Sequence, residues 1–142
     1  MEIKIDREEL FNELFMLSEY VADNGGNYKN GAIIDENREL LDVWWSESCS
    51  NMLMLLRYWL VVFDRYDGDD FNIEINLVNN ELTQQDNIKT LIKTILLNEI
   101  LSRWLIMTGS EQSVIYSALA DAKIKELINI VYFRKPVSYE EN

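Results

Sequence analysis

Two strongly apolar segments with helical spacing, residues 87–107 and 111–133, fill the last third of the chain and are separated only by Thr108-Gly109-Ser110. In the first segment the apolar residues occupy most sides of the helix. A helix of that kind is buried on most sides, so we expect this segment to form the central helix of a helical core. Gly109 is predicted to end it.

The final helix is expected to follow Ser110, which is predicted to cap it, and Pro136, the only proline, is predicted to end the ordered chain. Six of its residues are predicted to face the core: Val114, Ala118, Ala122, Leu127, Ile128 and Val131. The central helix before it is expected to start from a cap at Asp86. The two helices together build a core and contain no recognisable catalytic pattern.

Two earlier helices precede this pair. Residues 6–22 repeat apolar residues at helical spacing and begin with Asp6 and, three positions later, Glu9, which is the arrangement of a capping box. Residues 37–62 carry a longer stripe with three tryptophans, which is more typical of a core than of a binding surface. The polar, glycine-bearing segment 23–36 between them is long for a compact domain, and a flexible loop is expected there.

Between the second and third helices the spacing changes from helical to alternating. Four apolar residues alternate with polar ones: Phe71, Ile73, Ile75 and Leu77. This pattern is typical of a strand with one apolar face. An Asp-Gly turn at residues 67–68 favours a hairpin, which gives a ribbon over about 60–78, and residues 1–5 alternate in the same way and offer a further strand.

These segments predict a mainly α fold, a four-helix bundle-like domain with a small β-hairpin or ribbon inserted between helices 2 and 3. All 142 residues are expected to form a single domain, with the flexible loop 23–36, the ribbon at about 60–78 and a short acidic tail at 137–142. The longest apolar stretch, 52–63, is too short to span a bilayer, and no membrane association is expected.

The net charge of −12 is spread unevenly. Residues 1–50 carry twelve acids and four bases, residues 64–86 carry seven acids and one base, and residues 87–135 carry four acids and seven bases. Nucleic-acid binding requires clustered Lys and Arg to neutralise phosphates, so sequence-specific nucleic-acid binding is not expected. A basic patch on the last two helices stays an alternative.

The residue types of common catalytic sites are scarce in the sequence. There is no histidine, which excludes Ser/His and Cys/His nucleophilic sites and His-ligated metals. Cys49 lies in a helical pattern and is interpreted as a small buried residue. The acids around Gly68, at positions 64, 67, 69 and 70, lack the spacing of an EF-hand, which favours a solvated turn over a cation site. We therefore expect no enzyme activity, no cofactor and no metal.

Three segments carry a resemblance to a known family. They are the helix start Asp35-Glu36-Asn37-Arg38-Glu39-Leu40-Leu41-Asp42-Val43-Trp44-Trp45, the apolar helix 91–105 with Arg103-Trp104 before the turn 108–111, and the ending Tyr132-Phe133-Arg134-Lys135-Pro136. In this order they resemble the helical head-to-tail adaptor (connector) proteins of tailed bacteriophages and prophages, small helical bundles that form a ring beneath the portal. The likeness covers residues 35–136; the loop 23–36 and the ribbon depart from the pattern.

The resemblance implies a non-enzymatic virion structural protein, either a head-to-tail connector (adaptor) or another neck or tail ring component. Its implied partners are copies of itself in a ring and the portal or other neck and tail proteins. Its implied location is the neck or tail of the virion, after assembly in the host cytoplasm. Seven residues on the loop, the ribbon and the end of the last helix are predicted to contact partners: Tyr28, Lys29, Phe71, Ile73, Ile75, Arg134 and Lys135.

Two other functions stay open at this point. An acidic inhibitor, immunity protein or DNA mimic would bind a basic partner through the acids of the first helix and the turn Asp67–Asp70. Such a protein forms a tight one-to-one complex that is sensitive to salt. An enzyme or ligand-binding protein would instead use a pocket lined by four tryptophans: Trp44, Trp45, Trp59 and Trp104.

Overall fold

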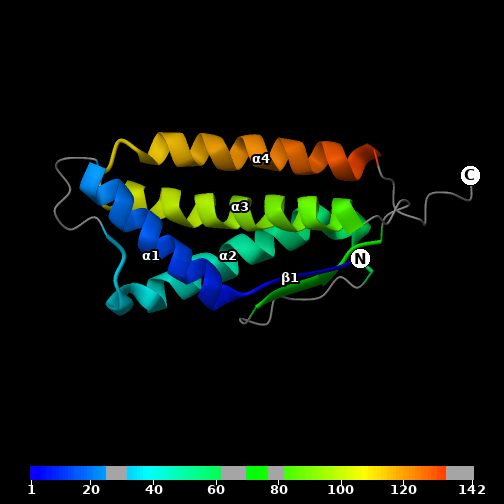
Figure 1. The fold of residues 1–142 in the computed structure, drawn as a ribbon, viewed down its shortest axis with the longest axis horizontal. Coiled ribbons are helices and arrows are strands. Elements are labelled where there is room, and N and C mark those ends of the chain that lie inside the picture. Colours follow the sequence, from blue (N-terminus) through cyan, green and yellow to red (C-terminus); the bar gives the residue numbers. More distant parts are fainter. Residues whose placement is uncertain (25–31, 62–69, 77–81, 134–142) are drawn as a thin grey trace, which may run out of the picture.

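The computed structural model describes residues 1–24, 32–61, 70–76 and 82–133. Its helices are α1 (Arg7–Asn24), α2 (Arg38–Leu56), α3 (Leu82–Met107) and α4 (Ser113–Phe133), and its strands are β1 (Glu2–Ile5) and β2 (Phe71–Glu74). Single 3-10 turns at Asp35–Asn37 and Arg57–Trp59 flank α2. The predicted fold class, a mainly helical domain with four helices and a small antiparallel sheet, is confirmed (Figure 1).

Helix α3 lies in the middle of the molecule, with α4 along one side and α1 and α2 on the other (Figure 1). Nine of its large apolar residues are buried: Ile88, Leu91, Ile92, Ile95, Leu96, Ile100, Leu101, Trp104 and Leu105. Burial of this apolar surface is the main source of stability in such a fold. The predicted central helix is thus confirmed, although it begins at Leu82, so that Asp86 lies inside the helix instead of capping it.

The turn between α3 and α4 is fixed by hydrogen bonds around Gly109. Its φ of 76° is a left-handed conformation that glycine adopts without steric penalty. The Ser110 N–H donates to the carbonyl of Leu105 (2.8 Å) and the Gly109 N–H donates to that of Ile106 (3.1 Å), the two bonds of a Schellman cap. The Ser110 hydroxyl accepts a hydrogen bond from the N–H of Gln112 (3.2 Å). The predicted helix end at Gly109 is confirmed, and Ser110 caps the turn that leads into α4.

The two strands run antiparallel, with Ile3 opposite Ile73 and Ile5 opposite Phe71. These four side chains are buried, and β1 packs against α3, while the alternate residues of both strands are exposed. The predicted strand with one apolar face is confirmed. The further strand expected in residues 1–5 is its partner.

The other edge of β2 pairs with the chain that leaves α2. The Val61 N–H donates to the carbonyl of Glu74 (2.9 Å), and the Asn76 N–H donates to that of Trp59 (2.6 Å). Helix α2 therefore ends at Leu56, before the predicted end at residue 62, because the chain must extend to reach this edge. The Asp-Gly turn expected at residues 67–68 lies outside the described residues.

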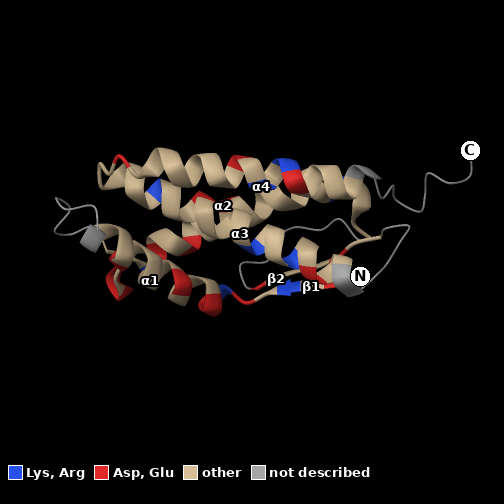
Figure 2. Ribbon diagram, turned by 45° about the horizontal axis from the view of Figure 1, so that its top comes forward, with Lys and Arg blue, Asp and Glu red and all other residues tan. Residues whose placement is uncertain are grey.

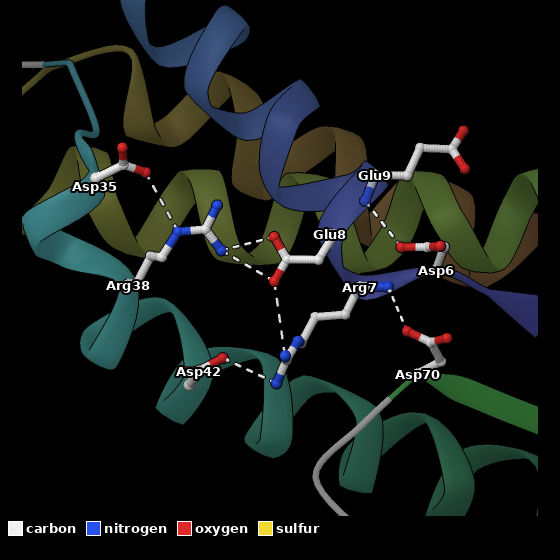
Figure 3. A network of polar contacts seen from close by, with 8 residues as sticks. All are labelled: Asp6, Arg7, Glu8, Glu9, Asp35, Arg38, Asp42 and Asp70. Atoms are coloured by element: carbon white, nitrogen blue, oxygen red, sulfur yellow. Dashed lines mark hydrogen bonds and ion pairs between the residues drawn. The ribbon is translucent and has the colours of Figure 1, made fainter.

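Two aspartates hold the start of α1 (Figure 3). The Asp6 carboxylate accepts a hydrogen bond from the N–H of Glu9 (3.0 Å), in agreement with the predicted cap. The Asp70 carboxylate accepts one from the N–H of Arg7 (3.0 Å). Carboxylates at a helix N-terminus satisfy its unpaired N–H groups and interact favourably with the helix dipole. Because Asp70 directly precedes β2, this contact also ties the sheet to α1.

Helix α4 packs mainly on α3, and this corrects the predicted orientation of its side chains. Three residues expected to face the core are exposed instead: Val114, Ala118 and Ala122. Leu127 and Val131 are buried as expected, together with Ala120, and Ile128 is half-buried. A helix supported by one neighbour buries one stripe, whereas this helix carries apolar residues on nearly all sides.

Candidate functional site

An exposed apolar surface covers the outer side of α4, away from α3. We call it the outer face, and it consists of Val114, Ile115, Ala118, Leu119 and Ala122. Val114 is 72% exposed and Ile115 is 53% exposed. At the adjoining end of α3, Ile106 and Met107 are also more than half exposed. Contiguous apolar surface on a folded protein marks sites of interaction with other molecules.

The position of α4 at one edge of the molecule leaves this face open. In Figure 1 the helix lies along the top, on the far side of α3 from α1 and α2. Its charged residues, Asp121, Lys123, Lys125 and Glu126, all follow Ala120, and Lys123 and Glu126 form an ion pair (3.3 Å). Helix α4 thus has an uncharged first part, up to Ala120, and a later part in which the charges balance.

A charge network lies on the opposite side of the molecule, where α1 meets the start of α2 (Figure 3). The Arg38 Nη1 contacts both carboxylate oxygens of Glu8 at 2.7 and 2.9 Å, and its Nε contacts Asp35 at 3.3 Å. The Arg7 Nη1 lies 3.3 Å from Asp42 Oδ1. The hydrogen bond with Glu8 raises the pKa of Arg38, which stays protonated. Exposed ion pairs add little stability, so the network mainly orients the two helix starts.

Acids dominate the surface around this network. In Figure 2 they colour several turns of α1 red. Among the described side chains, the acids of α1, α2 and the turn before α2 are Glu8, Glu9, Glu13, Glu19, Asp35, Glu36, Glu39, Asp42 and Glu47. Arg7 and Arg38 are the bases of the same elements. We call this the acidic surface, and its charge is complementary to a basic partner.

A cleft of about 620 Å³ lies between β1, α1 and α3. It is lined by charged residues of both signs and by Ile5, Thr90, Thr94 and Leu97; the charged residues are Lys4, Lys89, Lys93, Asp6, Glu9 and Glu13. The Lys93 Nζ lies 2.8 Å from Glu13 and 3.3 Å from Glu9, and the hydrogen bond with Glu13 raises the pKa of Lys93. The charges of this cleft therefore compensate one another across its walls.

The predicted contact residues fall into two groups. Phe71, Ile73 and Ile75 of the ribbon are buried in the core of this chain, where Ile75 is completely covered. Tyr28, Lys29, Arg134 and Lys135 lie outside the described residues. Any contact that β2 makes with a partner would therefore have to leave these three apolar side chains in place.

The tryptophans do not converge on either of two surface depressions. Trp45 and Trp104 are buried, and Trp44 and Trp59 are half-buried against the core. Trp45 meets Phe11 edge to face, with 6.1 Å between the ring centres. Neither the cleft beside α1 nor a shallower hollow lined by Ser46, Glu47, Ser50, Asn51 and Arg103 contains a tryptophan. The four tryptophans serve the core, and Cys49 is buried as predicted.

Within the described ranges, no group of three or more Cys, Asp or Glu side chains is arranged to hold a metal ion. Most of the acidic cluster around Gly68 lies outside those ranges, and its last member, Asp70, binds the start of α1. None of the described helices combines the length and apolar character needed to cross a membrane.

The outer face is the feature that the sequence pattern did not reveal. The sequence does contain a sign of it, because the α4 segment has apolar residues at more positions than one neighbouring helix can cover. Periodicity alone assigns such residues to the core and cannot tell which of two apolar stripes has a neighbour.

Two candidate interaction surfaces, the outer face of α4 and the acidic surface, therefore lie on opposite sides of α3. The chain matches no protein-family model, no curated protein and no solved structure, so no relative indicates which surface is used.

Proposed function

We propose that this chain is a non-enzymatic virion structural protein, a head-to-tail connector or a related neck or tail ring component. In this role it assembles through contacts with copies of itself and with the portal or other neck and tail proteins. The observation that carries the proposal is the outer face of α4, whose apolar residues are left uncovered by the described part of the chain. Apolar surface of this kind is typical of a subunit that has a partner.

The placement of the two surfaces also supports assembly. A ring requires that one face of a subunit meets a different face of the next. The outer face and the acidic surface lie on opposite sides of α3, and α4 presents Lys123 and Lys125 near its apolar half. Contact between the acidic surface of one copy and α4 of the next would join two different faces, with Lys125 beside the acids of the neighbouring copy.

The experiment is a density-gradient fractionation of lysate from cells that produce the particles. The amount of this chain in each fraction is measured by mass spectrometry, with a known portal or capsid protein as the reference. We expect a fixed ratio of this chain to the reference across the particle peak. Recovery of the chain only in the soluble fractions would contradict the virion role.

The acidic surface favours one alternative, an inhibitor or DNA mimic that binds a basic protein. In that case the soluble chain forms a one-to-one complex whose association rate falls steeply with salt. Replacing the exposed acids Glu36 and Glu39 with Lys would weaken such a complex. The same substitutions test the acidic surface in the ring, where they would reduce incorporation into particles.

A further inference from the structure

The outer edge of β1 carries main-chain groups that the sheet does not use. The Met1 nitrogen donates to the carbonyl of Ile75 (3.2 Å), and the Ile75 N–H donates to the carbonyl of Met1 (2.8 Å). In an antiparallel pair such double bonds recur at every second residue, so the odd-numbered residues of β1 bond to β2. The N–H and carbonyl groups of Glu2 and Lys4 therefore point to the opposite edge.

The described part of the chain covers little of this edge. The Gln85 side chain of α3 donates to the Glu2 carbonyl (2.5 Å), but no described group bonds to the N–H or the carbonyl of Lys4. The cleft between β1, α1 and α3 lies here, and Lys4 and Ile5 line it from β1. Exposed strand edges pair readily with another extended chain, and native proteins usually cover them. Strand β1 thus has β2 on one side and an open position on the other.

The charges on the exposed face of the sheet indicate what kind of segment would fit this position. Glu2 lies directly opposite Glu74, and two like charges in such a cross-strand pair are unfavourable. Lys4 lies opposite the uncharged Asn72, and it forms no ion pair with any described residue. A strand in the open position would compensate both charges if it placed a base beside Glu2 and an acid beside Lys4.

The inner side of the open position is formed by α3. Ile3 and Ile5 point into the core, so alternate residues of an added strand would also point inward. There they would meet the wall of the cleft at Thr90, Thr94 and Leu97. β-Branched apolar residues such as valine suit a half-buried position of this kind. Because α1 and α3 border the cleft, it fits one extended segment better than the sheet of a second folded copy.

We propose that this cleft binds an extended segment of a partner protein, which adds a strand antiparallel to β1. An acidic residue of the segment lies beside Lys4, and a basic residue two positions later lies beside Glu2. In strand addition, main-chain hydrogen bonds give affinity and alternate side chains give specificity. The antiparallel direction lets one residue of the segment use both open groups of Lys4, whereas a parallel strand would divide them between two residues.

The proposal concerns a surface other than the outer face and does not depend on the virion role. The probe is the blocked pentapeptide valine-glutamate-valine-lysine-valine, titrated to about 5 mM into the isotope-labelled full chain and followed by two-dimensional NMR. In the free chain the Lys4 amide is expected to exchange with water faster than the amides of Ile3 and Ile5. The probe should slow the exchange of the Lys4 amide and shift the signals of Lys4, Thr90 and Thr94.

Modified probes test the strand pairing and its register. N-methylation of the glutamate removes the donor to the Lys4 carbonyl and should abolish binding. N-methylation of the central valine, whose N–H would point away from β1, is the matched control and should be tolerated. A probe with glutamate and lysine exchanged has the same composition but places like charges together, and it should bind about fivefold more weakly.

A charge reversal in the chain tests the same register from the other side. Lys4→Glu is expected to weaken binding of the original probe about fivefold. Lys125→Glu on α4 makes the same charge change on the far side of α3 and should bind the probe as the wild type does. Both positions are exposed, and unchanged amide signals away from each substitution show that the variant is folded.

Several results would overturn the proposal. A Lys4 amide that is already protected in the dilute free chain would show that the chain itself covers the edge, and protection that grows with chain concentration would assign the edge to a second copy. No shift at Lys4, or equal binding of the two N-methylated probes, would refute strand addition. Equal binding of the exchanged probe, or of the Lys4→Glu chain, would refute the charge pairing. Equal shifts with free glutamate would show an adventitious anion contact only.

Discussion

Helices α3 and α4 are both strongly apolar, yet the fold covers them very differently. Helix α3 has neighbours on several sides, and its apolar residues are buried around much of its circumference. Helix α4 rests mainly on α3 and buries a single stripe through Ala120, Leu127 and Val131. The comparison shows that apolar composition indicates how much surface must be covered, while the neighbours decide which surface stays open. In this chain the open surface is the outer face of α4.

The largest expected effect is the contrast between equivalent truncations in the two helices. Ile95→Ala in α3 removes a completely buried side chain and should lower the free energy of unfolding by about 2–5 kcal/mol. Ile115→Ala on the outer face should change it by less than about 0.5 kcal/mol, since this side chain is already exposed. Urea unfolding of both variants measures the difference. A similar loss in both would show that α4 is covered within the monomer.

The turn that joins the two helices gives the next largest effect. Gly109→Ala places a side chain at a φ of 76°, which should cost about 1–2 kcal/mol of stability. Apart from the two adjacent residues, no described residue has an atom within 4 Å of the added methyl group, so the loss reports backbone strain. Thermal unfolding measures it. A variant as stable as the wild type would show that the Schellman turn does not set the α3–α4 geometry.

The third prediction concerns Glu99, an acid of α3 whose pKa is affected by Asp121 of α4. Burial raises the pKa of the Glu99 carboxyl, Asp121 on α4 raises it further, and Arg103 opposes this. The charged form is therefore disfavoured in the fold, and Glu99→Gln should be more stable than the wild type at pH 7.

This advantage has a defined dependence on pH. Because the folded-state pKa lies above the unmodified value of 4.5, the wild type gains stability as the pH falls through the folded-state pKa, and the difference closes near 4.5. Unfolding of both chains at several pH values measures the difference, with the exposed Glu39→Gln as the control. A difference that is constant over this range would contradict the burial of Glu99 beneath α4.

The smallest effect belongs to the charge network on the other side of the molecule. Arg38→Gln removes the contacts with Glu8 and Asp35 and should cost less than about 1 kcal/mol, because these groups are exposed to solvent. The loss should disappear at high salt. Denaturant unfolding at low and high salt measures it. A large loss of unfolding free energy that salt does not reduce would show that the network contributes strongly to the packing of α1 on α2.

Much of the fold could be predicted from the sequence because its local patterns were unambiguous. The nearly continuous apolar surface of residues 87–107 indicated a central helix, Gly109 indicated its end, and the strict alternation after residue 70 indicated a strand. The partner of this strand was harder to predict. The Asp-Gly turn favoured a hairpin with the preceding residues, and residues 1–5 offered a further strand. In the structure β2 uses both of its edges, one for β1 and one for residues 59–61.

The candidate site could not be predicted, for a related reason. Apolar residues at Val114, Ala118 and Ala122 have the spacing of a core stripe, and so do Leu127 and Val131. Both stripes satisfy the same period, and only the position of α3 separates them. The apolar residues chosen as partner contacts, Phe71, Ile73 and Ile75, instead belong to the core. Exposure depends on tertiary contacts that a periodic pattern does not contain.

One measurement tests most directly whether the outer face of α4 is the surface by which the chain associates in particles. Producing cells whose copy of the chain carries Val114→Lys and Leu119→Lys are fractionated on a density gradient beside wild-type cells. Cells with Met54→Lys and Tyr58→Lys, which alter exposed residues near the end of α2 and in the turn after it, outside the acidic surface, serve as the matched control. We expect the α4 variant to be folded but missing from the particle fractions, while the control variant is retained. Equal amounts of the two variants in those fractions would show that the outer face is not the contact surface.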